Sequence, residues 1–144
     1  MDFKDCIKFV TENPLCFLAT SEGDQPRVRA LALWFVDENG FYFATMYTKQ
    51  VWKQMMANPK VEVCFYNNPA NMMEGKQMRV AGKIETIDDK ELQKKAVDDC
   101  AAIDNLTGKS LGPLWRVFRI HSGEAWFFTL ADTSRETELE RIRF

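Results

Sequence analysis

The chain has 144 residues, which fits one domain, and we expect that domain to span residues 1–144. With 46% hydrophobic and 28% charged residues, the composition is that of a globular protein and excludes a disordered one. Nineteen Lys and Arg against 21 Asp and Glu leave a net charge of −2, which gives no overall reason to expect nucleic acid or an acidic membrane as a partner.

The first part of the chain predicts one helix followed by three strands. Apolar residues at helical spacing indicate a short amphipathic helix, which Asn13-Pro14 ends. Strands are expected at residues 15–21, 27–36 and 41–45, separated by turn-forming residues. The Asn39-Gly40 pair favours a hairpin between the last two strands, and we expect the three to form an antiparallel meander.

The second part of the chain mixes helices with further strands. Helices are expected over residues 49–56 and 88–104, and strands over residues 61–66, 77–86, 115–120 and 124–130. Gly82, inside one of these strands, indicates a bulge. Six or seven strands with two or three helices predict a mainly β fold, a barrel with helices around it.

The expected strand over residues 27–36 is apolar on both faces beyond its two arginines. One face carries Arg27, Arg29, Leu31, Leu33 and Phe35, and the other carries Val28, Ala30, Ala32, Trp34 and Val36. A strand that is wet on one side would alternate apolar with polar residues. We therefore expect one face to fill the barrel and the other to meet a partner chain or a flat ligand.

Scarce residues and missing motifs exclude several classes. His121 is the only histidine, so zinc sites built from several histidines are excluded. The four cysteines form no CxxC pair, so we expect no metal site, and Cys16 and Cys64 are expected as buried free thiols. No GxSxG, GxGxxG or P-loop motif occurs. No secretory signal and no run of roughly 20 apolar residues is present, so we expect a soluble, cytoplasmic protein without membrane contact.

Two pairs of basic residues indicate a site for an anion. Arg27 and Arg29 leave the same face of a strand, and Lys49 and Lys53 share one face of a helix. Threonines in the loop before that helix suit capping, and a helix N-terminus attracts anions. The set would suit a phosphate dianion, because Arg can clamp it with two hydrogen bonds. The other interpretation is that both pairs are solvated surface charges.

Five stretches together resemble a known family. They are residues 25–31 (QPRVRAL), 39–45 (NGFYFAT), 49–55 (KQVWKQM), 58–63 (NPKVEV) and 77–84 (QMRVAGKI). Their order and spacing are similar to those of the pyridoxamine 5′-phosphate oxidase-like family of FMN-binding split barrels. The resemblance runs from about residue 15 to residue 89, with a weaker echo at residues 123–128.

The resemblance implies a six- to seven-stranded antiparallel split β-barrel with flanking helices, and a homodimer with FMN at its interface. The cofactor-binding residues expected from the residues and the resemblance together are Arg27, Arg29, Ala30, Leu31, Ala44, Thr45, Lys49, Lys53, Gln77, Trp115 and Trp126. Arg29 with Lys49 and Lys53 would bind the FMN phosphate, and the backbone after Arg29 would run beside the isoalloxazine ring. Gln77 would reach toward the flavin, and Trp115 or Trp126 would pack on it from the second subunit.

The chain departs from the vitamin-forming oxidases of that family. Arg119-Ile120-His121 precedes Glu124-Ala125-Trp126, the reverse of their order, and Trp34 stands where they hold a substrate-contacting Lys. Both departures argue against pyridoxamine phosphate oxidation and favour the short, nitroimidazole reductase-like branch. We therefore expect an oxidoreductase that passes electrons from reduced FMN to a small-molecule acceptor, with no evident catalytic acid or base.

Other functions stay open at this stage. A non-catalytic protein that binds flavin or haem is the main alternative, and for haem the axial ligand would be His121, a Cys or a Tyr. A small barrel that binds nucleic acid is a third, against which the balanced charge argues. Deazaflavin, which related split barrels use, stays open beside FMN.

Overall fold

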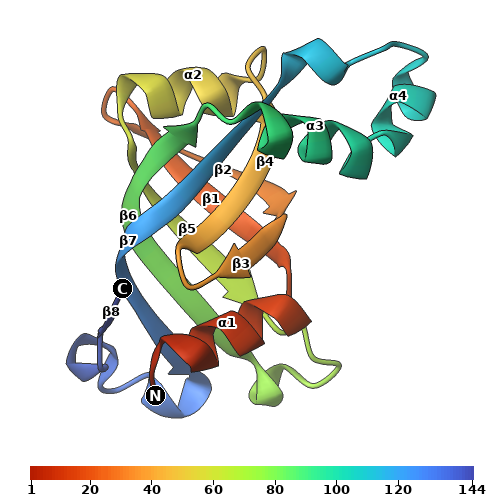
Figure 1. The fold of residues 1–144 in the computed structure, drawn as a ribbon. Helices are drawn as coiled ribbons and strands as arrows, with labels where there is room; N and C mark the ends of the chain where they lie inside the picture. The colour runs from red at the N-terminus through yellow and green to blue at the C-terminus, as the bar shows by residue number, and fades with distance from the viewer.

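The structure, a computed structural model that describes residues 1–144, is built on one eight-stranded antiparallel sheet rolled into an unclosed barrel (Figure 1). The strands are β1 (Leu15–Glu22), β2 (Gln25–Ala32), β3 (Phe35–Asp37), β4 (Gly40–Met46), β5 (Lys60–Tyr66), β6 (Lys76–Ile87), β7 (Trp115–Thr129) and β8 (Ile142–Arg143). Their order in the sheet is β2-β1-β5-β6-β7-β4-β3, and β8 adds to β7. The expected split barrel is confirmed, with eight strands in place of the expected six or seven. The stretch over residues 27–36 is divided and the short β8 is added, whereas the two strands expected over residues 115–130 are joined.

Helices lie at the ends and side of this sheet. They are α1 (Phe3–Glu12), α2 (Gln50–Ala57), α3 (Lys90–Asp99) and α4 (Ala102–Thr107), with short 3-10 turns at Met72–Glu74, Gly112–Leu114, Leu130–Asp132 and Glu136–Glu138. Figure 1 shows α1 and α2 at opposite ends of the rolled sheet. The expected helix over residues 88–104 is divided into α3 and α4. None of the helices has the length and apolar character needed to cross a membrane.

The expected continuous strand over residues 27–36 is wrong, because the chain changes partner in its middle. The Leu33 amide donates to the Pro14 carbonyl at 2.8 Å, and the next amide, that of Trp34, donates to the Tyr42 carbonyl at 3.0 Å. As a result β2 pairs with β1, and β3 pairs with β4. Both hairpins of the expected meander are present, but β2 and β3 lie at the two edges of the sheet. This exchange of partners produces the split in the barrel.

The expected strands at 115–120 and 124–130 are one long strand, β7, which pairs with both β4 and β6. The register of β6 against β7 shifts between Gly82 and Ile84, which confirms the expected bulge. A side chain at Gly123, opposite Gly82, would bring its Cβ within 2.2 Å of the Ala81 carbonyl oxygen. The two strands can therefore approach closely at this bend only because glycine is present.

Helix α1 is fixed at its start by reciprocal side-chain capping. The Asp2 carboxylate accepts hydrogen bonds from the Lys4 and Asp5 amides, and the Asp5 carboxylate accepts one from the Asp2 amide at 2.8 Å. The buried face of the helix then covers one end of the barrel with Cys6, Phe9 and Val10.

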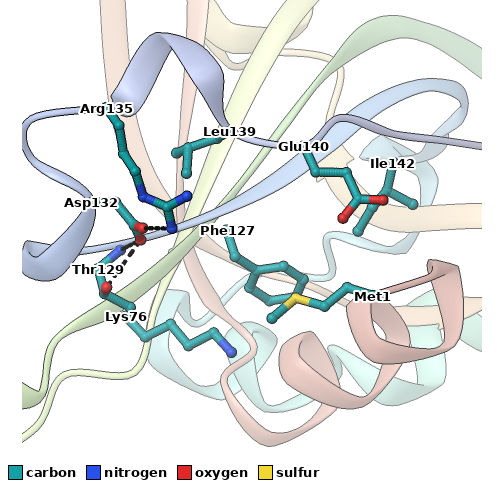
Figure 2. Close-up of a pocket in the computed structure, with 9 residues that line it drawn as sticks. All are labelled: Met1, Lys76, Phe127, Thr129, Asp132, Arg135, Leu139, Glu140 and Ile142. Carbon is teal, nitrogen blue, oxygen red and sulfur yellow. Dashed lines mark hydrogen bonds and ion pairs between the residues drawn. The ribbon is translucent and has the colours of Figure 1, made fainter.

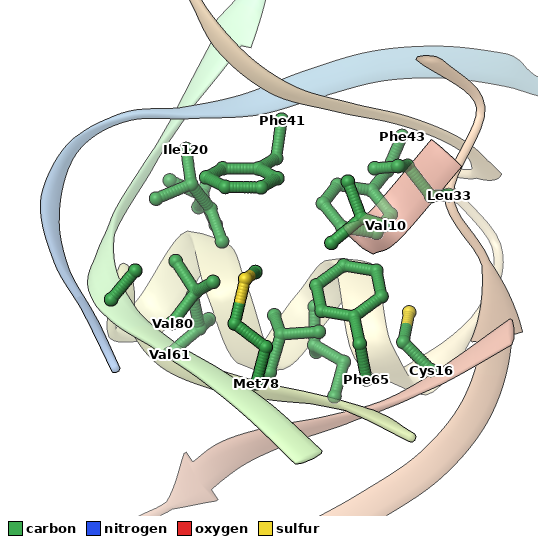
Figure 3. Packing of buried hydrophobic residues seen from close by; sticks show 14 of the residues in the cluster. Val10, Cys16, Leu33, Phe41, Phe43, Val61, Phe65, Met78, Val80 and Ile120 are labelled. Atoms are coloured by element: carbon green, nitrogen blue, oxygen red, sulfur yellow. The ribbon is translucent and has the colours of Figure 1, made fainter. Parts of the chain in front are cut away.

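The inward faces of the strands, with buried residues of α1 and α2, form a single main core of 20 buried residues (Figure 3). Aromatic rings fill much of it, and the Phe43 and Phe118 rings stack with centroids 5.1 Å apart. All four cysteines are free, and Cys16 lies within this core, as expected. Burial raises the pKa of its thiol to about 12. Cys64, expected to be buried as well, is half-buried.

Candidate functional site

The guanidinium of Arg29 is held entirely by neutral oxygen atoms. From β2 it donates to the Leu18 carbonyl at 3.2 Å, to Thr20 Oγ1 at 2.8 Å and to Gln54 Oε1 on α2. It forms no ion pair. Burial, followed by the charge of Arg27, lowers its pKa. A half-buried cation without a counter-ion favours the approach of an anion, because charge is poorly screened there.

Gln54 connects the elements around Arg29. Its side chain is 3% exposed, and its Oε1 accepts from both Arg29 and Thr20 Oγ1, the latter at 2.6 Å. Its Nε2 donates to Glu22 Oε2 at 3.1 Å. Gln54 of α2 is therefore hydrogen-bonded both to β1 and, through Arg29, to β2. The sequence analysis missed Gln54 and Thr20. The available signal was a polar residue three positions after Val51 on the apolar side of the helix.

Arg27 extends the same cluster but has a carboxylate partner. Its Nη2 lies 3.0 Å from Glu22 Oε1, and both side chains are about half exposed. Hydrogen bonds from Gln54 and Arg27 lower the pKa of the Glu22 carboxyl. Glu22 is therefore ionised at neutral pH and neutralises Arg27, which leaves Arg29 as the uncompensated arginine.

Helix α2 contributes two more uncompensated cations. Lys49, the N-cap residue, and Lys53 form no ion pair. The expected capping of α2 by a threonine is wrong: no side chain caps this helix, so the N–H groups of its first turn are free of side-chain acceptors. Lys53 lines a hollow of about 350 Å³ together with Glu22 and Gln54. This hollow adjoins the network that holds Arg29.

Three further expected residues lie where β4 and β7 approach α2. Thr45 is buried and pairs with Arg116, and Ala44 pairs with Val117. Trp115, the first residue of β7, is also buried. The β4 residues directly precede the loop that leads into α2, so they lie toward the same end of the barrel as Lys49.

Gln77 and Trp126 lie away from this cluster. Gln77 pairs with Tyr66 at the end of β5, whereas α2 precedes the start of that strand, so one chain does not place Gln77 beside Arg29. Trp126 is 5% exposed, and the guanidinium carbons of Arg79 and Arg141 lie 4.9 and 3.6 Å from its ring centroid. Its ring is thus already in contact with cations of its own chain.

The outer face of β1 and β2 leaves large apolar side chains uncovered. Val28 is 69% exposed, Leu15 57% and Phe17 45%. Phe17 pairs with Ala30 on β2 and with Cys64 on β5, so these side chains share one continuous face. The sequence pattern predicts one strand face that meets a partner or ligand, and this exposed face corresponds to it. Ala30 lies on this face, whereas Leu31 lies on the opposite one.

His121, the one histidine, has a structural contact. It is exposed on β7, and its Nδ1 lies 2.8 Å from the Asn39 carbonyl oxygen in the turn between β3 and β4. Its contact therefore ties β7 to this turn, and it takes no part in the hydrogen bonds around Arg29.

Comparison with known proteins gives the family of this fold. The family model of pyridoxamine 5′-phosphate oxidase matches residues 4–127, and the chain therefore belongs to that family. A NimC/NimA family protein from Clostridium acetobutylicum has a similar structure, with 27% identity, a TM-score of 0.73 and coverage of 98% of this chain and 92% of that one. A FAD-binding protein from Mesorhizobium loti shares the fold at 23% identity, with a TM-score of 0.67 and coverage of 88% and 94% of the two chains.

The pyridoxine/pyridoxamine 5′-phosphate oxidase of Myxococcus xanthus is 29% identical to this chain over 91 residues. The match covers 62% of this chain and 42% of that oxidase. The chain thus spans less than half the length of this relative. The family expected from the sequence is confirmed.

Proposed function

We propose that this protein is a flavoprotein that binds FMN between two copies of the chain and passes electrons from reduced FMN to a small-molecule acceptor. The observation that carries the proposal is the half-buried Arg29, whose hydrogen-bond partners are all neutral. One of them, Gln54, lines a hollow together with the unpaired Lys53. Membership of the pyridoxamine 5′-phosphate oxidase family supports a phosphorylated flavin as the anion. The four free thiols support a reducing compartment, which we propose is the cytoplasm.

The residues present fit the phosphate end of FMN. Arg29 has N–H donors beyond those it uses within the chain, since a guanidinium carries five. Lys49, Lys53 and the first-turn amides of α2 would supply further donors, and Arg27 would keep Glu22 neutralised. When bound, FMN would supply the redox chemistry, while the chain supplies its orientation and electrostatics.

The remaining expected residues would contact the flavin beyond its phosphate. The backbone at Ala30 and Leu31 and the β4 residues Ala44 and Thr45 would border the ring system. Gln77, Trp115 and Trp126 would contribute from other strands or from the second copy. Because one chain does not place Gln77 beside Arg29, we propose that dimerisation completes the site. The exposed apolar face of β1 and β2 would form the contact between copies, because large uncovered apolar patches mark interaction surfaces.

Trp34 supports an acceptor other than pyridoxamine phosphate. Its indole Nε1 donates to Asp99 Oδ2 on α3 at 2.8 Å, so this position offers no cation to a phosphate ester. A nitroaromatic compound or a quinone is a suitable first acceptor to test. Anaerobically reduced protein should be reoxidised by such an acceptor faster than free reduced FMN is, in a stopped-flow absorbance measurement.

Removal of the phosphate contacts tests the cofactor site. We expect Arg29→Ala combined with Lys49→Ala to weaken FMN binding by about 1.5–3 kcal/mol for each charge-assisted contact that is lost. Fluorescence titration with FMN measures the change. Lys4→Ala, a change to an exposed lysine on α1 at the opposite end of the barrel from α2, is the matched control. Unchanged FMN affinity in the double variant would contradict the placement of the phosphate.

A further inference from the structure

A hollow of about 620 Å³ lies where α2 meets α3 and the adjoining ends of β6 and β7 (Figure 1). Helix α2 contributes Trp52 and Met56, which are four positions apart and share one face of the helix. Lys53 and Gln54 are not part of its lining, so it shares no residue with the hollow that adjoins the Arg29 network. Its size falls within the range of sites for small molecules, roughly 300–1,000 Å³.

Apolar side chains make up most of this lining. They are Trp52, Met56, Ile87, Pro113 and Val117. Trp52 packs against the main core, which restricts the motion of its ring, and it is only half-buried. Aromatic rings pack favourably both on other rings and on the thioether of Met. The lining therefore suits a flat aromatic body.

Arg116 is the one cation of the lining, and contacts within the chain fix the orientation of its guanidinium. Its Nη1 donates to the Pro113 carbonyl at 3.0 Å and to the Trp115 carbonyl at 2.8 Å. Its Cζ lies 4.8 Å from the centroid of the Tyr47 ring, a cation–π contact. Arg116 forms no ion pair, and its Nε and Nη2 make no hydrogen bond within the chain. These two neighbouring nitrogens form an edge that can bind a carboxylate through two parallel hydrogen bonds.

Asp88 is the one acidic residue of the lining, and it opposes an anionic ligand less than Arg116 attracts one. It follows Ile87, which pairs with Val117, so it lies across the strand pair from Arg116. It is exposed and forms no ion pair, so water screens its charge. Arg116 is half-buried, and its charge is screened less. Asp88 would thus compete weakly with a ligand for Arg116.

We propose that this hollow binds an aromatic carboxylic acid in its ionised form. The ligand carboxylate would accept hydrogen bonds from Nε and Nη2 of Arg116. Its ring would pack against Trp52 and Met56 of α2. A single charged group beside a flat ring matches this lining, because the lining has one fixed cation next to apolar walls. The site is additional to the proposed flavin site and does not depend on flavin binding.

Titration of the full-length protein with 2-naphthoate at neutral pH, followed by amide NMR shifts, tests this proposal. The comparison ligand is 2-naphthamide, which has the same ring but a neutral amide in place of the carboxylate. We expect saturable binding of 2-naphthoate with shifts around Trp52 and Arg116, and affinity at least about tenfold lower for 2-naphthamide. Arg116→Gln should weaken 2-naphthoate binding by a similar factor. Asp88→Asn should strengthen 2-naphthoate binding and leave 2-naphthamide binding unchanged, because it removes the competing charge.

Arg143→Gln, a change to an exposed arginine on β8 outside the hollow, is the matched control and should bind 2-naphthoate as the unaltered chain does. Thermal unfolding checks that each variant is folded. Absence of saturable binding, or equal binding of 2-naphthoate and 2-naphthamide, would overturn the proposal. So would unchanged affinity in a folded Arg116→Gln protein.

The same titration in the presence of saturating FMN separates this proposal from the proposed function. We expect the affinity for 2-naphthoate to be the same with and without FMN. Displacement of 2-naphthoate by FMN would show that the hollow is part of the flavin site, and would overturn the proposal of an additional site. A protein that binds 2-naphthoate but no FMN would contradict the proposed function alone.

Discussion

At the scale of single residues, the α2 end of the barrel is organised by the hydrogen bonds that Arg29 donates to Leu18, Thr20 and Gln54. The bond from Arg29 to Gln54 crosses from β2 to α2, and Gln54 in turn holds Glu22 beside Arg27. Among the cations that could bind a phosphate, Gln54 forms a hydrogen bond only with Arg29. We therefore expect it to act on ligand binding by holding Arg29 in position.

Gln54→Leu tests that role through the choice between flavins. The change removes the acceptor shared by Arg29 and Thr20, and we expect FMN binding to weaken by about 1–3 kcal/mol. Riboflavin lacks the phosphate, so its affinity should stay unchanged. Parallel fluorescence titrations with FMN and riboflavin measure the two effects.

Gln93→Leu is the matched control. It also removes a half-buried hydrogen bond of a glutamine side chain, in this case from Gln93 on α3 to the Trp115 carbonyl. It should leave the ratio of the two affinities unchanged. An equal loss of FMN and riboflavin binding in Gln54→Leu would show that Gln54 only supports the fold.

Part of this site could be predicted from sequence, and part could not. The shared faces of Arg27 with Arg29 and of Lys49 with Lys53 follow from strand and helix periodicity. The role of Gln54 could not be predicted, because its partner Thr20 is 34 positions away in the sequence. Only the antiparallel fold brings them together.

At the scale of elements, the hairpin between β3 and β4 was predictable and the break before β3 was not. Asn39-Gly40 carries a strong turn signal. The segment from Leu31 to Trp34 is continuously apolar and contains no Gly or Pro, so no local signal marks the point where the chain changes partner. That change depends on hydrogen bonds to Pro14 and Tyr42, which are distant in sequence.

Gly40→Ala tests how tightly this hairpin fits against β7. Gly40 has a φ of +120°, and a Cβ there would lie 2.1 Å from the Ile120 carbonyl oxygen. Both the backbone strain and the clash oppose alanine, so we expect the free energy of unfolding to fall by at least about 2 kcal/mol. Urea denaturation measures it.

Gly23→Ala provides the comparison, because Gly23 also has a positive φ, +61°, but has open space around it. We expect it to cost only about 1 kcal/mol, the strain of the left-handed conformation alone. An equal loss in the free energy of unfolding for the two variants would show that the close approach of β7 to Gly40 does not add to the cost of alanine.

At the scale of the whole molecule, the two ends and the outer face of the barrel have different chemistry. The α2 end gathers uncompensated cations, and the outer face of β1 and β2 exposes Val28, Leu15 and Phe17. The α1 end holds a hollow of about 300 Å³ whose lining includes Lys76 and Phe127 (Figure 2). An isologous contact through that face would cover these side chains on both copies. It would also bring residues of a second chain toward a flavin bound near Arg29.

Native mass spectrometry of the purified full-length protein, incubated with FMN, tests the central claim most directly. We predict a species with the mass of two chains and two FMN molecules, which loses FMN in the Arg29→Ala, Lys49→Ala double variant. A single chain that takes up no FMN, or a dimer that binds riboflavin as readily as FMN, would contradict the account.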